Sequence, residues 1–239
     1  MNRSISLDFV SSKRGKRWVS YFDRLGFGNL SREKDLVEVF NENRPFLARA
    51  MESAEDNGSV ECVWFSDTII FYSTDDSRSS FWGVAEASET YFDELLYLGI
   101  PVRGAMAFGD FYGDGASGIY LGKALVDACE YGEKFNWLGF VLHPSALLRM
   151  PEVGQPPPSE LYYKRWDAEF KNRTTNGMEQ ETVCAYLVGP KSIMPTDGGH
   201  PYLATLKEMA RGASVEDHRR KYQNTIQFIE SFSGSQITL

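Results

Sequence analysis

Hydrophobic residues recur along the chain with two different periods, which predicts interleaved strands and helices. An apolar run at 19–22 predicts a first strand, which breaks at Gly26 and Gly28. Apolar runs on both sides of Ser66 and Asp67 predict a β-hairpin with Asp67 at its tip. Further strands are expected at 102–108, 111–112, 118–121, 138–142, 161–163 and 183–188.

Helical periodicity begins directly after the first strand. Ser31 is a suitable N-cap for a helix over 31–43, and Pro45 is expected to kink or interrupt that helix before helical sequence resumes to residue 56. A second amphipathic segment over 80–98 is expected to end at Gly99. Further helices are expected at 123–136, 144–148, 200–209 and 214–232, and the segment 151–158 is expected to be irregular.

The order of these elements up to residue 148 is β-α-β-β-α-β, which predicts an α+β, ferredoxin-like domain with extra C-terminal strands and helices. The 239 residues are enough to bury one large core. The proline-rich segment 151–158 is too short to link independent domains. We therefore expect a single domain over 1–239, with a motif-bearing core at about 18–148 and a C-terminal extension at about 159–239.

Charge and cysteine content exclude several classes of function. The formal net charge of -8 leaves no basic face for nucleic acid or an anionic membrane. The 3 cysteines are far apart and include no C-x-x-C pair, so neither a disulfide framework nor a zinc site is expected. No secretory signal and no long apolar segment is present, so we expect a cytoplasmic protein that does not bind membranes.

Two aspartates are the strongest candidates for chemistry. Asp23 ends the first strand and Asp67 lies at the hairpin tip, so the two carboxylates converge if these strands are neighbours in one sheet. Converging carboxylates repel each other, and divalent cations with oxygen ligands are the usual remedy. The alternative is structural: Asp23 caps the following turn and Asp67 sits in an ordinary hairpin.

The glycine-containing turn after the first strand is a candidate phosphate site. Residues 25–31 offer backbone N–H groups before a helix N-terminus, an arrangement that suits phosphate oxygens. Gly26 and Gly28 can instead serve only to relieve backbone strain.

Four motifs in order carry a family resemblance: FDRLGF at 22–27, SDT at 66–68, PVRGAMAFGDF at 101–111 and LGKALVDA at 121–128. This set resembles the class III nucleotide cyclases, and it is most similar to the bacterial pyrimidine (uridylate and cytidylate) cyclases of antiphage defence. The resemblance covers residues 18–148.

The resemblance implies a catalytic site and an assembly. By resemblance, Asp23 and Asp67 bridge two divalent cations, Mn²⁺ or Mg²⁺, and the main-chain carbonyl of Arg24 adds a ligand. The active unit is expected to be a homodimer. Arg103 can alternatively form a surface or dimer-interface salt bridge, and Lys123 can be a solvated residue of a first helical turn. The residues implied in nucleotide binding are Phe22, Leu25, Gly26, Phe27, Gly28, Arg103 and Lys123.

Departures from the purine cyclases of this class indicate a different base. The usual transition-state Asn and Arg align with Val126 and Glu130, and the usual purine-reading residues align near Glu61 and Ile119. A bulky wall could exclude purines, and its candidates are Trp64, Phe65, Ile119, Tyr120 and Leu121. We therefore predict that UTP is converted to 3′,5′-cyclic UMP and pyrophosphate, as a signal in antiphage defence. The alternatives are CTP as substrate, or a catalytically inactive nucleotide-binding module.

Overall fold

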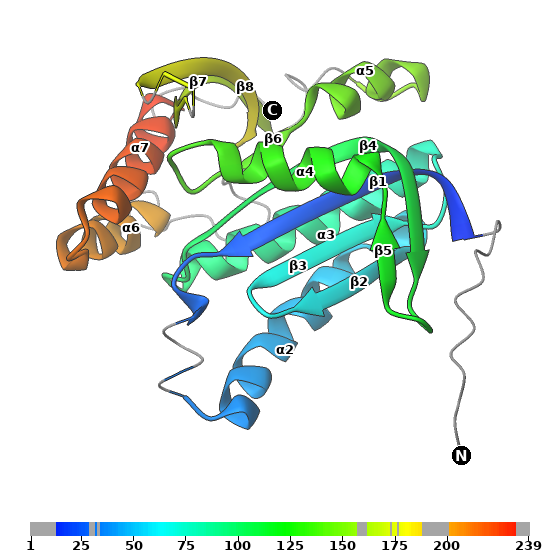
Figure 1. Cartoon of the computed structure of the whole chain (residues 1–239), viewed down its shortest axis with the longest axis horizontal. Coiled ribbons are helices and arrows are strands. Elements are labelled where there is room, and N and C mark those ends of the chain that lie inside the picture. Colours follow the sequence, from blue (N-terminus) through cyan, green and yellow to red (C-terminus); the bar gives the residue numbers. More distant parts are fainter. Residues whose placement is uncertain are drawn as a thin grey trace.

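The computed structural model describes residues 13–28, 32, 34–156, 162–172, 174–175, 177–187 and 201–232. Within this part of the chain eight strands form one mixed sheet in the order β2-β3-β1-β4-β6-β8-β7, with β5 paired to β4 (Figure 1). The strands are β1 (Arg14–Arg24), β2 (Val60–Phe65), β3 (Thr68–Ser73), β4 (Val102–Asp114), β5 (Ile119–Leu121), β6 (Phe140–Leu142), β7 (Tyr163–Lys171) and β8 (Met178–Tyr186). The described helices are α2 (Leu36–Ser53), α3 (Arg78–Tyr97), α4 (Lys123–Lys134), α5 (Pro144–Glu152), α6 (Pro201–Gly212) and α7 (Glu216–Phe232), with a 3-10 turn at Glu55–Asn57.

This arrangement confirms the α+β fold class. The elements β1, α2, β2, β3, α3 and β4 follow the expected β-α-β-β-α-β order, and the later strands and helices extend it. Only β4 and β6 pair in parallel among the described strands, and the other strand pairs are antiparallel. None of the described helices is long and apolar enough to cross a membrane.

The central strand β1 has two different faces. Trp18 and Phe22 are fully buried in the main core with residues of α3, while Val19 and Tyr21 belong to a smaller cluster with residues of α4. Figure 1 accordingly shows α4 and α3 on opposite faces of the sheet. Because side chains alternate along a strand, Asp23 follows Tyr21 onto the face that carries α4.

The first helix differs from its prediction at two points. It begins at Leu36, where Asp35 is the N-cap and accepts a hydrogen bond from the Val37 N–H at 2.8 Å. The predicted cap Ser31 lies outside the described residues. Pro45 lies inside the helix, so the predicted interruption was wrong, and the alternative, a kink, stays a prediction. The bond that proline cannot donate would go to the carbonyl of Asn41, an exposed residue whose carbonyl can be solvated by water.

The second predicted helix is confirmed as α3, and both of its ends follow local rules. Gly99 has a φ of 72° and donates its N–H to Leu96, while Ile100 donates to Leu95, which together form a Schellman C-cap. At the other end Ser77 caps the helix by accepting from the Ser80 N–H. Helix α3 therefore starts two residues before the prediction, at Arg78.

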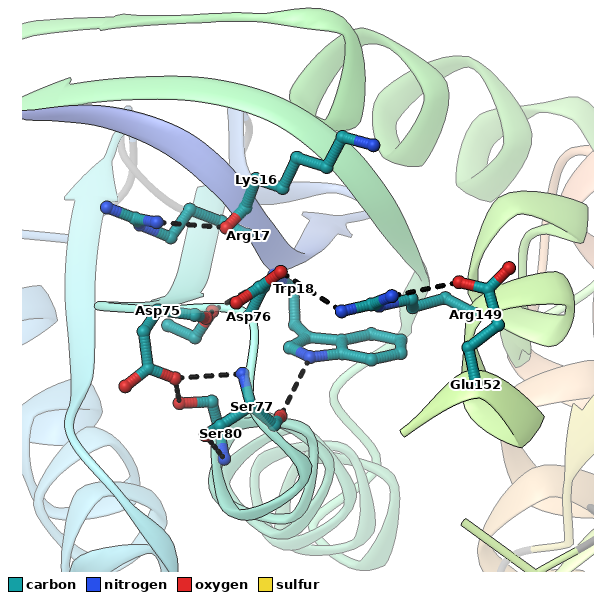
Figure 2. Close-up of polar contacts among 10 residues, drawn as sticks. Lys16, Arg17, Trp18, Asp75, Asp76, Ser77, Ser80, Arg149 and Glu152 are labelled. Carbon is teal, nitrogen blue, oxygen red and sulfur yellow. Dashed lines mark hydrogen bonds and ion pairs between the residues drawn. The ribbon is translucent and has the colours of Figure 1, made fainter. Parts of the chain in front are cut away.

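Polar contacts fix the loop that leads from β3 into α3 (Figure 2). The Asp75 carboxylate accepts from the Ser80 hydroxyl at 2.5 Å and from the Ser77 N–H at 2.9 Å. The Trp18 indole donates to the Ser77 carbonyl at 3.2 Å. Arg149 of α5 reaches Asp76 at 3.0 Å, so β1, this loop and α5 are joined at the end of the sheet remote from Asp23.

Several other elements are longer than predicted. The two short strands expected between 102 and 112 form the continuous strand β4, and α5 runs on to Glu152 through Pro151. Of the strands expected at 161–163 and 183–188, Tyr163 and residues 183–186 form one end of a hairpin with nine residues in each strand, and residues 161 and 188 lie outside the described residues. Sequence reasoning missed the outer part of this hairpin, although Trp166, Ala168 and Phe170 alternate with charged residues along β7.

Candidate active site

Asp23 and Asp67 lie at the same end of two neighbouring strands. In the antiparallel pairing of β1 with β3, Asp23 is opposite Thr68, the residue that follows Asp67. The Arg24 N–H donates to the Asp67 carbonyl at 3.0 Å, which ties the hairpin tip to the end of β1. The sequence argument required these two strands to be neighbours in one sheet, and the structure confirms that they are.

The turn that carries Asp67 is strained. Ser66 has a φ of 57°, the left-handed region that side chains other than glycine seldom adopt. With Ser66 and Asp67 between paired residues Phe65 and Thr68, the turn is a two-residue hairpin loop. The Trp64 indole donates to the Ser66 carbonyl at 2.7 Å and stabilises this conformation. Backbone strain of this kind is concentrated at functional sites.

Arg103 on β4 is the direct partner of Asp23. It lies opposite Asp23 in the pairing of β1 with β4, and its Nε and Nη2 contact Asp23 Oδ2 at 2.9 and 2.8 Å. Its Nη1 donates to the main-chain carbonyl of Glu133 at 2.8 Å. The side chains of Arg103 and Asp23 are each 15% exposed, so this is a largely buried ion pair. This salt bridge lies within the chain and is largely buried, so it differs from the surface or dimer-interface salt bridge given as the alternative for Arg103.

Glu133 reaches this site because α4 lies very close to β4. A Cβ on Gly132 would be only 3.0 Å from the backbone of Gly104 and Ala105, so no larger residue fits there without movement. The last turn of α4 is thereby placed beside Arg103.

Tyr21 and Glu133 form a hydrogen bond that sequence reasoning missed. The Tyr21 hydroxyl donates to Glu133 Oε1 at 2.6 Å, and it lies 3.5 Å from the hydroxyl of Thr68. Tyr21 has a sequence signal, since it is two residues before Asp23 and therefore on the same face of β1. Glu133 has none, because only the packing of α4 on β4 brings it here.

Burial and neighbouring charges act in opposite directions on Asp23. Burial is the largest effect and raises its pKa, the Arg103 guanidinium lowers it, and the nearby Glu133 and Asp67 carboxylates raise it further. The net pKa of Asp23 is raised above the usual value for an aspartate. The Glu133 and Asp67 carboxylates thus act on Asp23, whose own carboxylate contacts the Arg103 guanidinium, and an additional cation at this site would stabilise the ionised form of Asp23.

The donor atoms at this end of the sheet fit a hard divalent cation. Asp23 uses only Oδ2 to bind Arg103, so Oδ1 remains for another partner. The Arg24 side chain turns away to Asn43 and lies over the Phe27 ring, which leaves its main chain at the site. Asp23, Asp67 and the Arg24 carbonyl are oxygen donors, as Mg²⁺ and Mn²⁺ prefer. No cluster of three or more His, Cys, Asp and Glu side chains suited to a metal occurs among the described residues, so water or phosphate oxygens would complete the coordination.

The glycine turn has fewer backbone N–H groups available to a phosphate than its sequence suggests. The Leu25 N–H donates to the Pro101 carbonyl at 2.9 Å and is not available to a ligand. The side chains of Phe22 and Phe27 are buried, so these residues could contact a nucleotide only through their backbone. Gly26, with a φ of 79°, and Gly28 both face open space. A Cβ added at either glycine would meet no other atom within 4 Å, so this part of the turn is sterically open.

Lys123 does not belong to the group around Asp23. Its side chain is 73% exposed and pairs with Asp127 at 2.5 Å on the same helix. It begins α4, whereas Glu133 lies ten residues later, about 15 Å along the helix axis. The expectation that Lys123 faces the same end of the sheet as Asp23 was wrong, because α4 runs antiparallel to β4.

A second polar group lies on the same face of the sheet, remote from Asp23. The Tyr72 hydroxyl donates to Glu61 at 2.6 Å, and the Tyr120 ring packs against Tyr72 with the centroids 6.0 Å apart. Together with Lys13 and Arg17, Glu61 and Tyr72 line a cleft of about 390 Å³. Tyr72 is four residues from Thr68 along β3, about 13 Å away.

The predicted bulky wall does not form one surface. Trp64 stacks on Phe40 of α2, and Phe65 is 75% exposed at the hairpin tip. Of the proposed wall residues, Tyr120 is the one packed beside Glu61 and Tyr72. Alternation along β2 explains the separation, because Trp64 and Glu61 are on opposite faces of the strand.

Comparison with known proteins identifies the fold. No protein-family model and no curated protein matches the chain. Among solved structures, the adenylyl cyclase CyaB from P. aeruginosa is similar with a TM-score of 0.50 and 12% sequence identity, over 76% of this chain and 98% of that one. The dimeric guanylyl cyclase domain of the RhoGC fusion protein from Blastocladiella emersonii gives a TM-score of 0.49 at 11% identity, over 73% and 98% of the two chains. The guanylate cyclase domain of RhGC from Catenaria anguillulae, in complex with GTP, gives 0.47 at 11%, over 72% and 97%.

Proposed function

We propose that this protein is a nucleotide cyclase that converts UTP to 3′,5′-cyclic UMP and pyrophosphate. The observation that carries the proposal is the meeting of Asp23 and Asp67 on neighbouring strands, in a fold similar to that of the adenylyl cyclase CyaB. A half-buried group of three carboxylates with one guanidinium is suited to divalent cations and, through them, to a triphosphate.

Each residue of the group has a distinct role in this proposal. Asp23, Asp67 and the Arg24 carbonyl would hold two divalent cations, Mn²⁺ or Mg²⁺, which when bound lower the pKa of the ribose 3′-hydroxyl and offset triphosphate charge. Arg103 fixes the orientation of Asp23 through its two contacts to Oδ2. The backbone around Gly26 and Gly28 would face the phosphates.

The separation of the two polar groups supports the proposal of a homodimer. The metal residues and the group of Glu61, Tyr72 and Tyr120 share one face of the sheet but lie at different ends of it. Two copies related by a two-fold axis can place the second group of one subunit against the metal residues of the other. Each active site would then combine residues of both subunits.

A mixing experiment tests this shared site. Asp23→Ala protein and Glu61→Ala protein, each with little activity alone, would be unfolded, mixed in equal amounts and refolded. Half of the dimers would then be mixed, and each mixed dimer would keep one intact site, so about one quarter of wild-type activity should return. Control mixtures of Asp23→Ala with Asp67→Ala should stay inactive, because both lesions fall in one half-site. If folded dimers form but neither mixture recovers activity, the shared site is contradicted.

The choice of UTP rests on the residues near the second polar group. Glu61 and Ile119 stand near the positions where the purine cyclases carry their base-reading residues, and the side chains of Tyr72 and Tyr120 reduce the space available to a base. A small pyrimidine suits such a site better than a purine, and exclusion by bulk is an effective means of selectivity. By the resemblance to defence cyclases, cyclic UMP would act as a signal in antiphage defence.

Competition among nucleotides tests the substrate directly. The protein would be incubated with equimolar ATP, GTP, CTP and UTP and Mn²⁺, and the cyclic products measured by mass spectrometry. Cyclic UMP should dominate. A dominant cyclic CMP would correct the base, since CTP differs from UTP by an exchange of donor and acceptor at one position, and dominant cyclic AMP or GMP would contradict the pyrimidine assignment.

An inactive nucleotide-binding module is the second candidate. The observation that favours it is the pair Val126 and Glu130 on α4, both exposed, where the purine cyclases carry their transition-state Asn and Arg. Nucleotide binding without any cyclic product, in the presence of Mn²⁺ or Mg²⁺, would decide for this module.

A further inference from the structure

The C-terminal part of the chain forms a cleft that is separate from the carboxylate site. Its walls are the β7–β8 hairpin and helix α7, which Figure 1 shows at the end of the sheet occupied by the C-terminal elements. The cleft has a volume of about 540 Å³, within the range of small-molecule sites. It is lined by Trp137, Arg165, Trp166, Asp167, Glu169, Gln180, Thr182, Asn224 and Gln227.

Aromatic packing gives the cleft a rigid base. The ring of Phe228, a buried residue of α7, meets Trp137 edge-on at 4.9 Å and Trp166 at 5.5 Å. These contacts fix the planes of both indoles, and Trp166 remains partly exposed at the cleft. A fixed indole at the wall of a cleft is a stacking surface for a flat ring.

The lining carries two acidic side chains and one guanidinium. Asp167 accepts a hydrogen bond from the Thr182 hydroxyl at 2.5 Å, and Glu169 pairs with Arg220 at 2.7 Å. Arg165 has no ion-pair partner among the residues that the structure describes. Because the Thr182 hydroxyl is neutral, Asp167 keeps its negative charge, so the cleft presents the Arg165 guanidinium together with one carboxylate that has no cationic partner among the described residues.

Amide groups face the cleft from both walls. Gln180 comes from β8 and Gln227 from α7, and within the described residues neither side-chain amide has a hydrogen-bond partner. An amide presents a donor and an acceptor in one plane, which matches the paired donor and acceptor on the edge of a nucleobase.

We propose that this cleft binds a nucleoside monophosphate. The base would stack on Trp166 and form hydrogen bonds with Gln180 or Gln227, and Arg165 would contact the phosphate. A single guanidinium suits one phosphate group better than a triphosphate. The site is independent of the proposed cyclase reaction, since its lining includes none of Asp23, Asp67 and Arg103.

Calorimetric titration of the full chain tests this site. UMP and AMP would be compared with uridine and adenosine, all with EDTA present so that no metal supports binding elsewhere. We expect at least one monophosphate to bind about tenfold more tightly than its nucleoside. Arg165→Gln should abolish that preference, and Gln227→Ala should weaken binding of the monophosphate about tenfold. The matched control Arg44→Gln removes an exposed arginine of α2 and should change nothing.

Further variants separate this site from the carboxylate site. Asp23→Asn should retain monophosphate binding, and Arg165→Gln should retain any cyclase activity. Absence of binding by both monophosphates at millimolar concentration would overturn the proposal. Binding that is lost in Asp23→Asn but kept in folded Arg165→Gln and Gln227→Ala would also overturn it, because the ligand would then occupy the carboxylate site.

Discussion

Two nitrogens of Arg103, Nε and Nη2, contact the same carboxylate oxygen of Asp23, Oδ2, at 2.9 and 2.8 Å. The third contact of its guanidinium, to the Glu133 carbonyl, anchors it to the end of α4. Arg103 is therefore a positioning residue that orients Asp23 and partly neutralises it. Because Oδ1 is not used, this ion pair is compatible with a cation on the other side of the carboxylate.

Removal of either aspartate should abolish turnover. In Asp23→Ala and in Asp67→Ala a ligand of the proposed cations is lost, so formation of cyclic nucleotide from UTP and Mn²⁺ should fall by about a thousandfold or more. The fold should remain, as circular dichroism would show, because both side chains lie at the edge of the core. Asp56→Ala, at an exposed position in the 3-10 turn, is the matched control and should keep full activity. Wild-type yield from either site variant would refute the metal assignment.

Loss of Arg103 should destabilise the metal-free protein and be partly corrected by metal. Arg103→Met leaves the Asp23 carboxylate next to Glu133 and Asp67 without its counter-ion, at a cost of about 1–3 kcal/mol in the free energy of unfolding. Mn²⁺ should recover part of this loss, since it supplies positive charge at the same carboxylates. Urea unfolding with and without Mn²⁺ measures both effects. Equal stability of Arg103→Met and wild type without metal would show that the ion pair is not stabilising.

The raised pKa of Asp23 predicts that metal affinity depends on pH. A cation requires the ionised carboxylate, so the Mn²⁺ affinity should rise with pH through the raised pKa of Asp23 and become constant above it. In the metal-free protein the raised pKa of Asp23 acts in the opposite direction on the free energy of unfolding. The contribution of Asp23 to stability is largest at low pH, where the carboxyl is protonated, and it is lost as pH rises through the folded-state pKa. Titration of Mn²⁺ by electron paramagnetic resonance from about pH 4 to about pH 8 follows the transition. A transition at the ordinary pKa of an exposed aspartate would contradict the burial of Asp23.

The strained turn at Ser66 predicts a stabilising substitution. Glycine adopts a positive φ without a steric penalty, so Ser66→Gly should raise the free energy of unfolding by about 1 kcal/mol. The bond from Trp64 uses the backbone carbonyl and is kept. Ser66→Ala also loses the hydroxyl but keeps a Cβ at the positive φ. The difference in stability between Ser66→Gly and Ser66→Ala therefore isolates the steric penalty. If Ser66→Gly is no more stable than Ser66→Ala in thermal unfolding, the strain is not significant.

Local sequence determined most of the elements. The apolar run before Asp23 and the two runs around Asp67 predict β1 and the hairpin of β2 and β3, because periodicity and turn residues are local signals. Gly99 also fixed the end of α3, since its positive φ is a local requirement. The fold class followed from the order of such elements.

Packing decided what surrounds the two aspartates, and the sequence could not show it. Lys123 and Glu133 are both on α4, but the antiparallel placement of α4 on β4 brings Glu133 to Arg103 and carries Lys123 to the other end. Pro45 stays inside α2, where the carbonyl that loses its helical hydrogen bond belongs to the exposed residue Asn41. Packing decides that exposure, and no local rule predicts it. Residues distant in sequence meet only through the arrangement of whole elements. The sequence alone determined a strand that ends at Asp23 and a hairpin with Asp67 at its tip, whereas the tertiary structure decided that they are neighbours and which side chains orient and neutralise Asp23.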